Sequence, residues 1–152
     1  MKQPTGRLYS FEGKGDQGLK AYLLAMLAVL LFAYTAFYKF MEHERFLQTL
    51  TAVFIFGGYT TLLSWFVPVL ELVIVALILY PRTFRIGMWC FVSAMVMFTL
   101  YILAMLIWMD KLPCSCGGVI EKLSWPQHLI FNLAFIGLGL LALRLERLNH
   151  LN

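Results

Sequence analysis

The sequence has 152 residues, of which 61% are hydrophobic and only 13% are charged, and its formal net charge is +4. A soluble domain has about half apolar and about a quarter charged residues, so this composition indicates a membrane protein. The apolar runs lack the alternation of a transmembrane β-barrel, and the basic residues form no aromatic-interleaved patch for nucleic acid. We therefore expect an all-α membrane fold that contacts lipid and not nucleic acid.

Residues 1–19 are polar and glycine-rich, and we expect them to form an N-terminal tail. The first apolar run, Lys20–Phe40, has the roughly 20 residues that an α-helix needs to cross a bilayer. The charged stretch Met41–Arg45 predicts a turn. After it, Phe46–Phe56 is too short for a full span, which favours an interfacial helix.

Three more spans follow. They are predicted over Thr61–Tyr80, Ile86–Met109 and Gln127–Leu143. The second span stops at Pro81, which cannot continue a helix without losing a backbone hydrogen bond. Residues 20–147 are thus expected to form a four-transmembrane-helix bundle with a short interfacial helix after the first span, and residues 148–152 a C-terminal tail.

Basic residues are distributed unequally between the two sides of this bundle. Four spans place both termini on one side, with eight of the twelve Lys and Arg residues: Lys2, Arg7, Lys14, Lys20, Arg82, Arg85, Arg144 and Arg147. The other side has Lys39, Arg45, Lys111 and Lys122. By the positive-inside rule the termini are cytoplasmic, in a bacterial inner membrane, and the loop between the third and fourth spans is periplasmic or extracellular.

That loop contains two thiols. Cys114 and Cys116 are separated by one residue and followed by Gly117 and Gly118, which permit a sharp backbone bend. A bridge between such close cysteines is strained, and strained, exposed disulfides are the labile ones that suit electron exchange. The pattern predicts thiol–disulfide exchange on an oxidising side of the membrane. Inert thiols, lipid attachment or pairing with a partner protein are the alternatives.

Glu71 lies inside the second span. An ionisable side chain within the membrane is costly and is by default a functional candidate, here as a proton carrier. The alternative is a structural hydrogen bond to another helix, with Lys39 at the outer end of the first span as the partner.

Polar residues also enter the fourth span. Trp125, His128 and Asn132 have a spacing that places them on one helix face. That face could hold the head group of a quinone, with His128 or Asn132 bonding a ring oxygen and His128 moving protons. Alternatively, Trp125 and His128 anchor the helix at the interface and Asn132 bonds to another helix.

Other chemistry has little support in the sequence. A zinc site is not expected, because His128 is the only imidazole near the two thiols. Cys90 and the methionines and aromatic residues of the third span are interpreted as packing. There is no haem-binding CxxCH, no glycine-rich phosphate loop and no nucleophile elbow.

Several of these segments resemble the DoxX-like group of small membrane proteins, and most closely its methylamine-utilisation MauE branch. The similarity lies in Tyr38–Phe40 at the end of the first span, Pro68–Leu72 in the second, and the PCSCGG segment followed by Trp125 and Asn132. The four-helix vitamin K epoxide reductase group is a poorer match, since its members carry CxxC and usually a second cysteine pair.

The resemblance implies a role in forming or maintaining disulfides outside the inner membrane, with a thioredoxin-like partner, and in DoxX relatives a link to quinones. It implies that Cys114 and Cys116 are the redox pair and that Lys39 and Glu71 occupy the family's polar positions. We expect thiol–disulfide exchange coupled to a quinone or a thioredoxin-like or thiol-bearing protein. A non-catalytic membrane anchor or assembly subunit of a larger complex is the alternative, and a small-solute carrier is weaker.

Overall fold

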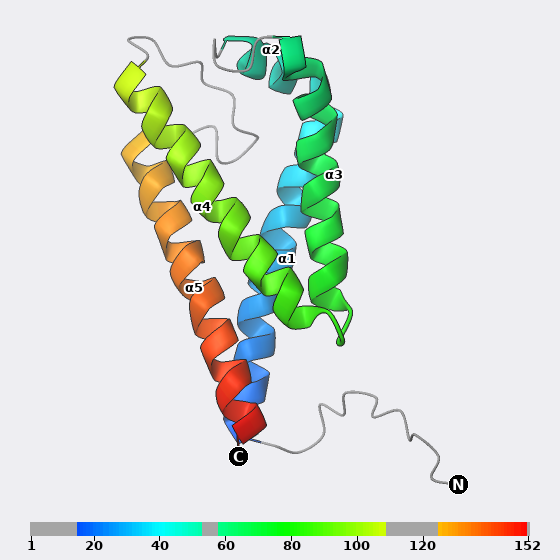
Figure 1. Ribbon diagram of the computed structural model, residues 1–152, viewed down its shortest axis with the longest axis vertical. Coiled ribbons are helices and arrows are strands. Elements are labelled where there is room, and N and C mark those ends of the chain that lie inside the picture. Colours follow the sequence, from blue (N-terminus) through cyan, green and yellow to red (C-terminus); the bar gives the residue numbers. More distant parts are fainter. Residues whose placement is uncertain (1–14, 53–57, 109–124, 152) are drawn as a thin grey trace, which may run out of the picture.

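The computed structural model describes residues 15–52, 58–108 and 125–151, and it contains five α-helices (Figure 1). These are α1 (Gly15–Met41), α2 (His43–Ala52), α3 (Thr60–Leu79), α4 (Phe84–Trp108) and α5 (Trp125–Leu151). The described ranges contain no β-strand. The prediction of an all-α bundle with a short helix after the first span is confirmed.

The four long helices form a ring. Helix α1 packs against α3 and α5, and α4 packs against the same two helices, so α1 and α4 lie on one diagonal of the bundle. The short helix α2 packs on α3 and α1, at the end of the bundle where α4 ends and α5 begins (Figure 1).

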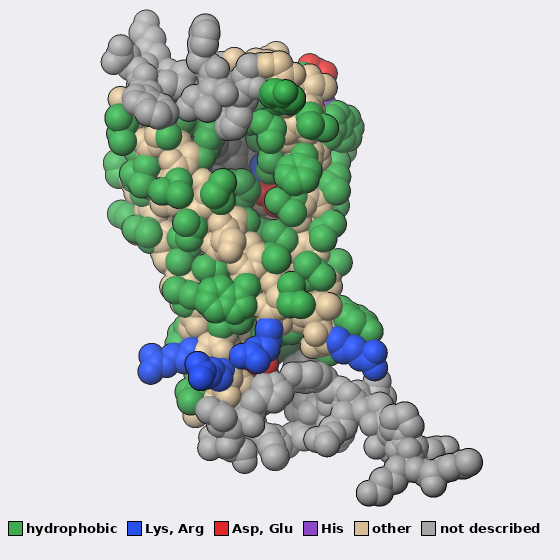
Figure 2. Space-filling view, viewed as in Figure 1, with side chains coloured by type: hydrophobic (Ala, Val, Ile, Leu, Met, Phe, Trp, Pro, Cys, Tyr) green, Lys and Arg blue, Asp and Glu red, His purple; other side chains and the backbone are tan. Residues whose placement is uncertain are grey.

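Each long helix is long and apolar enough to cross a membrane. The apolar stretches cover Gln17–Met41, Thr60–Leu79, Phe84–Ile107 and Pro126–Leu148. Large apolar side chains cover the outside of the bundle (Figure 2), as with Leu30 and Ile107, which are 65% and 76% exposed. Such a surface matches lipid and not water, and the chain is a multi-pass membrane protein.

The predicted turn between the first two helices is shorter than expected. Helix α2 begins at His43, so Glu42 alone breaks the helical assignment. The Glu42 amide donates to the Tyr38 carbonyl and the Phe46 amide donates to the Glu42 carbonyl, which carries helical hydrogen bonding around the corner. The predicted end of this helix at Phe56 lies outside the described residues.

Helices α1 and α5 extend beyond their predicted spans. Helix α1 starts at Gly15, within the predicted N-terminal tail, and α5 continues through the predicted C-terminal tail to Leu151. A helix need not stop at the edge of the hydrocarbon, because water can satisfy its terminal backbone groups outside. Near this end Arg85 of α4 forms an ion pair of 3.1 Å with the buried Glu146 of α5.

A tight hairpin joins α3 to α4. The Thr83 hydroxyl donates to the Leu77 carbonyl at 2.8 Å, which satisfies one of the free carbonyl groups at the end of α3. At Gly87 a Cβ atom would lie 2.6 Å from the Ile78 backbone nitrogen. Only glycine therefore allows the two helices to approach this closely.

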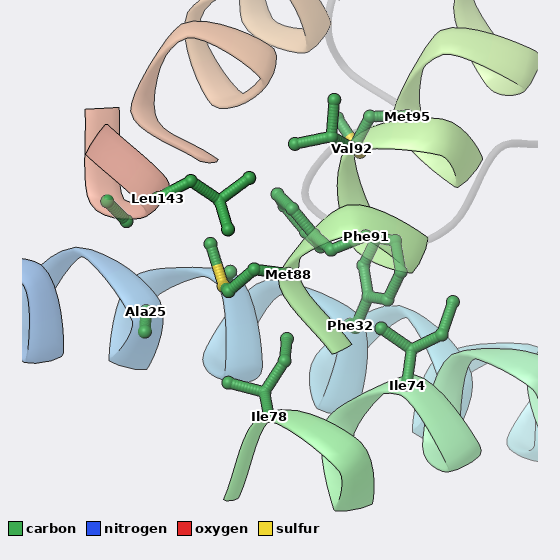
Figure 3. Packing of buried hydrophobic residues seen from close by; sticks show 11 residues of the cluster. Ala25, Phe32, Ile74, Ile78, Met88, Phe91, Val92, Met95 and Leu143 are labelled. Atoms are coloured by element: carbon green, nitrogen blue, oxygen red, sulfur yellow. The ribbon is translucent and has the colours of Figure 1, made fainter. Parts of the chain in front are cut away.

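The apolar core lies in the half of the bundle next to this hairpin, and Figure 3 shows how its side chains pack. Its largest members are Phe32, Phe91 and Met88, which are at most 1% exposed. Cys90 packs against this cluster as a half-buried free thiol, in agreement with its predicted packing role.

Candidate functional site

A cavity of about 290 Å³ occupies the half of the bundle nearest α2. All five helices line it, mostly with apolar side chains such as Leu63, Val67 and Phe131. Figure 2 shows a hollow between α3 and α4 in this half, with an acidic and a basic side chain visible inside it. The volume is at the lower edge of the roughly 300–1,000 Å³ of small-molecule sites, and a mostly apolar lining with a few polar groups is typical of them.

Lys39 and Glu71 form an ion pair in the wall of this cavity. Lys39 comes from the last turn of α1 and Glu71 from the middle of α3, and their side chains are 14% and 2% exposed. The Thr35 hydroxyl, one turn before Lys39, is close to the Glu71 carboxylate but donates its hydrogen to the Phe32 carbonyl at 3.2 Å. The sequence-based alternative for Glu71, a bond to Lys39, is confirmed, but the pair also faces a cavity.

Two aromatic rings flank the Lys39 ammonium group. The ring centroids of Phe46 and Phe98 lie 5.6 Å and 5.4 Å from its Nζ atom, within the range of a cation–π interaction. The ring faces and the carboxylate hold the charge in a largely apolar environment. The fixed position of the ammonium group follows from these contacts.

His128 and Asn132 line the same cavity from α5. They are one turn apart and only 8% and 6% exposed. The structure thus brings four predicted site residues together from three helices: Lys39, Glu71, His128 and Asn132. Of the other three predicted site residues, Cys114 and Cys116 lie outside the described residues, and the Trp125 side chain is not described.

Other polar side chains of the cavity were not predicted from the sequence. Thr35, Thr49 and Tyr101 also line it. The four-residue spacing of Thr35 and Lys39, which places both on one face of α1, was a usable signal. Tyr101 was assigned to packing with its neighbours, and the structure shows that Phe98 and Tyr101 face the cavity while Met88 and Met105 are buried.

The electrostatics of the cavity depend on one carboxylate. Glu71 Oε1 accepts from Lys39, but Glu71 Oε2 is buried and has no hydrogen-bond partner within the described residues. Nowhere in the described ranges do three or more His, Cys, Asp or Glu side chains gather as a metal site would require. The site is therefore an apolar pocket with an ion pair, an imidazole and a carboxamide.

The chain matches the family model described as methylamine utilisation protein MauE over residues 18–145. No curated protein and no solved structure matches the chain. The matched region includes α3, α4, most of α1 and α5, and every polar residue of the cavity. The broader DoxX-like relationship stays a prediction from the sequence. With most of its length matched, the chain belongs to the MauE family of membrane proteins.

Proposed function

We propose that this protein is a membrane redox protein that exchanges electrons through Cys114 and Cys116. The pair reacts with thiols of a thioredoxin-like or other thiol-bearing protein, and a membrane quinone accepts the electrons. The observation that carries the proposal is the cavity between the spans, in which charged and polar side chains line a mostly apolar wall. Quinone head groups combine a flat apolar ring with two polar oxygens, and the cavity has partners for both.

The position of the cavity supports a link to the cysteines. The cavity lies at the end of the bundle where α4 ends at Trp108 and α5 begins at Trp125, and residues 109–124 connect these helices in sequence. His128 and Asn132 lie just after this connection. Cys114 and Cys116 thus lie, in the sequence, between two helices that line the pocket.

The distribution of charge supports the proposed orientation. Basic side chains gather at the end of the bundle with the α3–α4 hairpin and the end of α5 (Figure 2). The described basic residues of that end are Lys20, Arg82, Arg85, Arg144 and Arg147. By the positive-inside rule this end is cytoplasmic in a bacterial inner membrane, and the cavity and the cysteines face outward.

The proposed chemistry balances as a two-electron exchange. A thiolate of the partner attacks the disulfide of Cys114 and Cys116 and releases one cysteine, and the partner's second thiol then attacks the mixed disulfide, which forms the partner's disulfide and releases the second cysteine. Oxidising the reduced pair to a disulfide releases two electrons and two protons, which a quinone takes up as it becomes a hydroquinone. His128 and Glu71 are the titratable groups of the cavity wall that we assign to proton transfer.

Replacing Cys114 and Cys116 with serine tests the proposal. We expect quinone reduction by a dithiol to fall to background in both single variants, because a disulfide needs both sulfurs. Cys90→Ser is the matched control, since Cys90 lies in the packed half of the bundle and should keep full activity. Unchanged activity in both loop variants would leave the membrane-anchor function instead.

A further inference from the structure

The cavity contains a buried hydrogen-bond acceptor that the described chain does not satisfy. Glu71 is 2% exposed and lines the cavity, and its Oε2 atom has no hydrogen-bond partner among the described residues. A buried charged oxygen without a donor is costly. A ligand that brings an O–H or N–H group to this oxygen would therefore gain binding energy there.

Two buried hydroxyl groups of the spans make no such demand. The Ser64 hydroxyl donates to the Thr61 carbonyl at 2.7 Å, and the Thr99 hydroxyl donates to the Met95 carbonyl at 2.8 Å. Both hydroxyl groups thus find a hydrogen-bond acceptor in the backbone of their own helix, as serine and threonine often do. The open acceptor on Glu71 thus stands apart from them.

Lys39 supplies the complementary group. Its ammonium group has three N–H donors, of which one bonds Glu71 Oε1, and the rings of Phe46 and Phe98 flank it. Aromatic faces accept cations weakly, so a ligand oxygen is a better partner for a remaining N–H group. The ion pair thus offers a ligand both a donor and an acceptor.

We propose that Glu71 makes this cavity selective for the reduced form of its ligand, so that hydroquinone binds more tightly than quinone. This inference rests on the proposed function and specifies how its quinone site works. A quinone has only acceptor oxygens, which suit Lys39 but not a carboxylate. A hydroquinone has two O–H groups, and one can donate to Glu71 Oε2 while its oxygen still accepts from Lys39.

The preference shifts the reduction potential of the bound quinone. Tighter binding of the reduced form raises the reduction potential of the bound quinone, by about 30 mV for each tenfold difference in affinity of a two-electron couple. The bound quinone is then a better electron acceptor than the quinone free in the membrane. Electron transfer from the reduced cysteine pair to the bound quinone is therefore more favourable than it would be with equal affinities for the two forms.

Equilibrium binding tests the inference without turnover. The full-length chain with both Cys114 and Cys116 replaced by serine is placed in lipid nanodiscs under anaerobic conditions. A short-tailed benzoquinone, its hydroquinone and the dimethyl ether of that hydroquinone are titrated by calorimetry. We expect the hydroquinone to bind at least about tenfold more tightly than the quinone and the ether, neither of which can donate a hydrogen bond.

Glu71→Gln identifies the residue responsible. The amide keeps the size of the side chain but offers an N–H group, so the quinone should keep its affinity and the hydroquinone should lose its advantage. Glu42→Gln removes an exposed carboxylate outside the cavity and should leave the affinity ratio unchanged. If Glu71→Gln does not fold, the ratio of hydroquinone affinity to quinone affinity, measured with the chain that retains Glu71, still tests the inference.

The possible results separate the inference from the proposed function. Equal affinities for quinone and hydroquinone, or a preference that persists in Glu71→Gln, would overturn the inference and leave a quinone-linked protein. Failure of all three compounds to bind would overturn the inference together with the quinone part of the proposed function. Loss of activity in the cysteine variants bears on the thiol chemistry alone.

Discussion

The rings of Phe32 and Phe91 lie 4.6 Å apart across the diagonal of the bundle, at a tilt of 53°. Phe32 belongs both to the apolar core and to the cavity wall, so this contact marks the boundary between the packed half and the hollow half. Centroid distances of this size are favourable for tilted aromatic pairs. The cavity exists because the four helices pack tightly on one side of this pair only.

Removing the Phe32 ring should therefore destabilise the bundle. Phe32→Ala is expected to lower the free energy of unfolding by about 3 kcal/mol, the low end of the range for a buried Phe→Ala change. Phe37→Ala, on the same helix, is the control, because Phe37 is 64% exposed and lipid can replace its contacts. Denaturant unfolding in detergent, followed by circular dichroism, measures both. Equal losses would contradict the placement of the core.

Glycine is required at Gly87 but not at Gly137. An added Cβ at Gly87 would press on the backbone of α3, so Gly87→Ala should cost about 1–3 kcal/mol of stability. At Gly137 no atom lies within 4 Å of the same position, so Gly137→Ala should be neutral or stabilise the helix by up to about 1 kcal/mol. Thermal unfolding of the two variants compares them. A stable Gly87→Ala protein would show that the α3–α4 hairpin is wider than described.

The ion pair between Lys39 and Glu71 should behave as a coupled buried pair. Lys39→Met alone leaves a buried carboxylate uncompensated and should cost about 3–5 kcal/mol, whereas the double variant with Glu71→Leu should recover most of that loss. The exposed pair of Glu42 and Arg45, 3.2 Å apart, is the control and should show a coupling below about 1 kcal/mol. A double-mutant cycle from unfolding curves measures both couplings. Additive effects at the buried pair would argue against the contact.

Filling the cavity should block its ligand without disturbing the cysteines. Leu63→Trp places a larger side chain in the cavity wall and should reduce quinone affinity at least about tenfold. Leu62→Trp changes the neighbouring residue, which is 68% exposed on the outside of α3, and should have no effect. Quinone titration of both purified variants provides the comparison. Reduced affinity in Leu62→Trp would place the ligand on the outer surface.

The proposed orientation predicts which thiols can be reached from outside the cell. In a Cys90→Ser background, a membrane-impermeant thiol reagent should label Cys114 and Cys116 in intact spheroplasts after reduction. Labelling restricted to inverted vesicles would reverse the topology and place the pair in the reducing cytoplasm. The gel shift of the labelled protein is the readout.

Sequence reasoning was most accurate where hydrocarbon imposes the structure. Without water in the bilayer core every backbone group must bond within its helix, so a long apolar run predicts a helix with little ambiguity. Pro81 located the α3–α4 hairpin, because a proline there removes a backbone hydrogen bond of the helix. The charged residues Arg82 and Arg85, which follow it, mark the same end of the span. The start of α2 at His43 was missed, because charged residues such as Glu44 and Arg45 are equally compatible with a turn or a helix.

The amino-acid sequence by itself determined that this chain crosses the membrane four times, has an interfacial helix after the first span and holds Lys39, Glu71, His128 and Asn132 within or beside the spans. It did not determine which helix faces meet, because spans that are apolar all round carry no stripe to mark an inner face. Only the tertiary structure decided that Lys39 and Glu71, 32 residues apart, form a pair, and that His128 and Asn132 share their cavity. The physical reason is that side-chain packing between the helices, and not hydropathy, brings the helices into close contact in one half of the bundle and leaves a cavity in the other half.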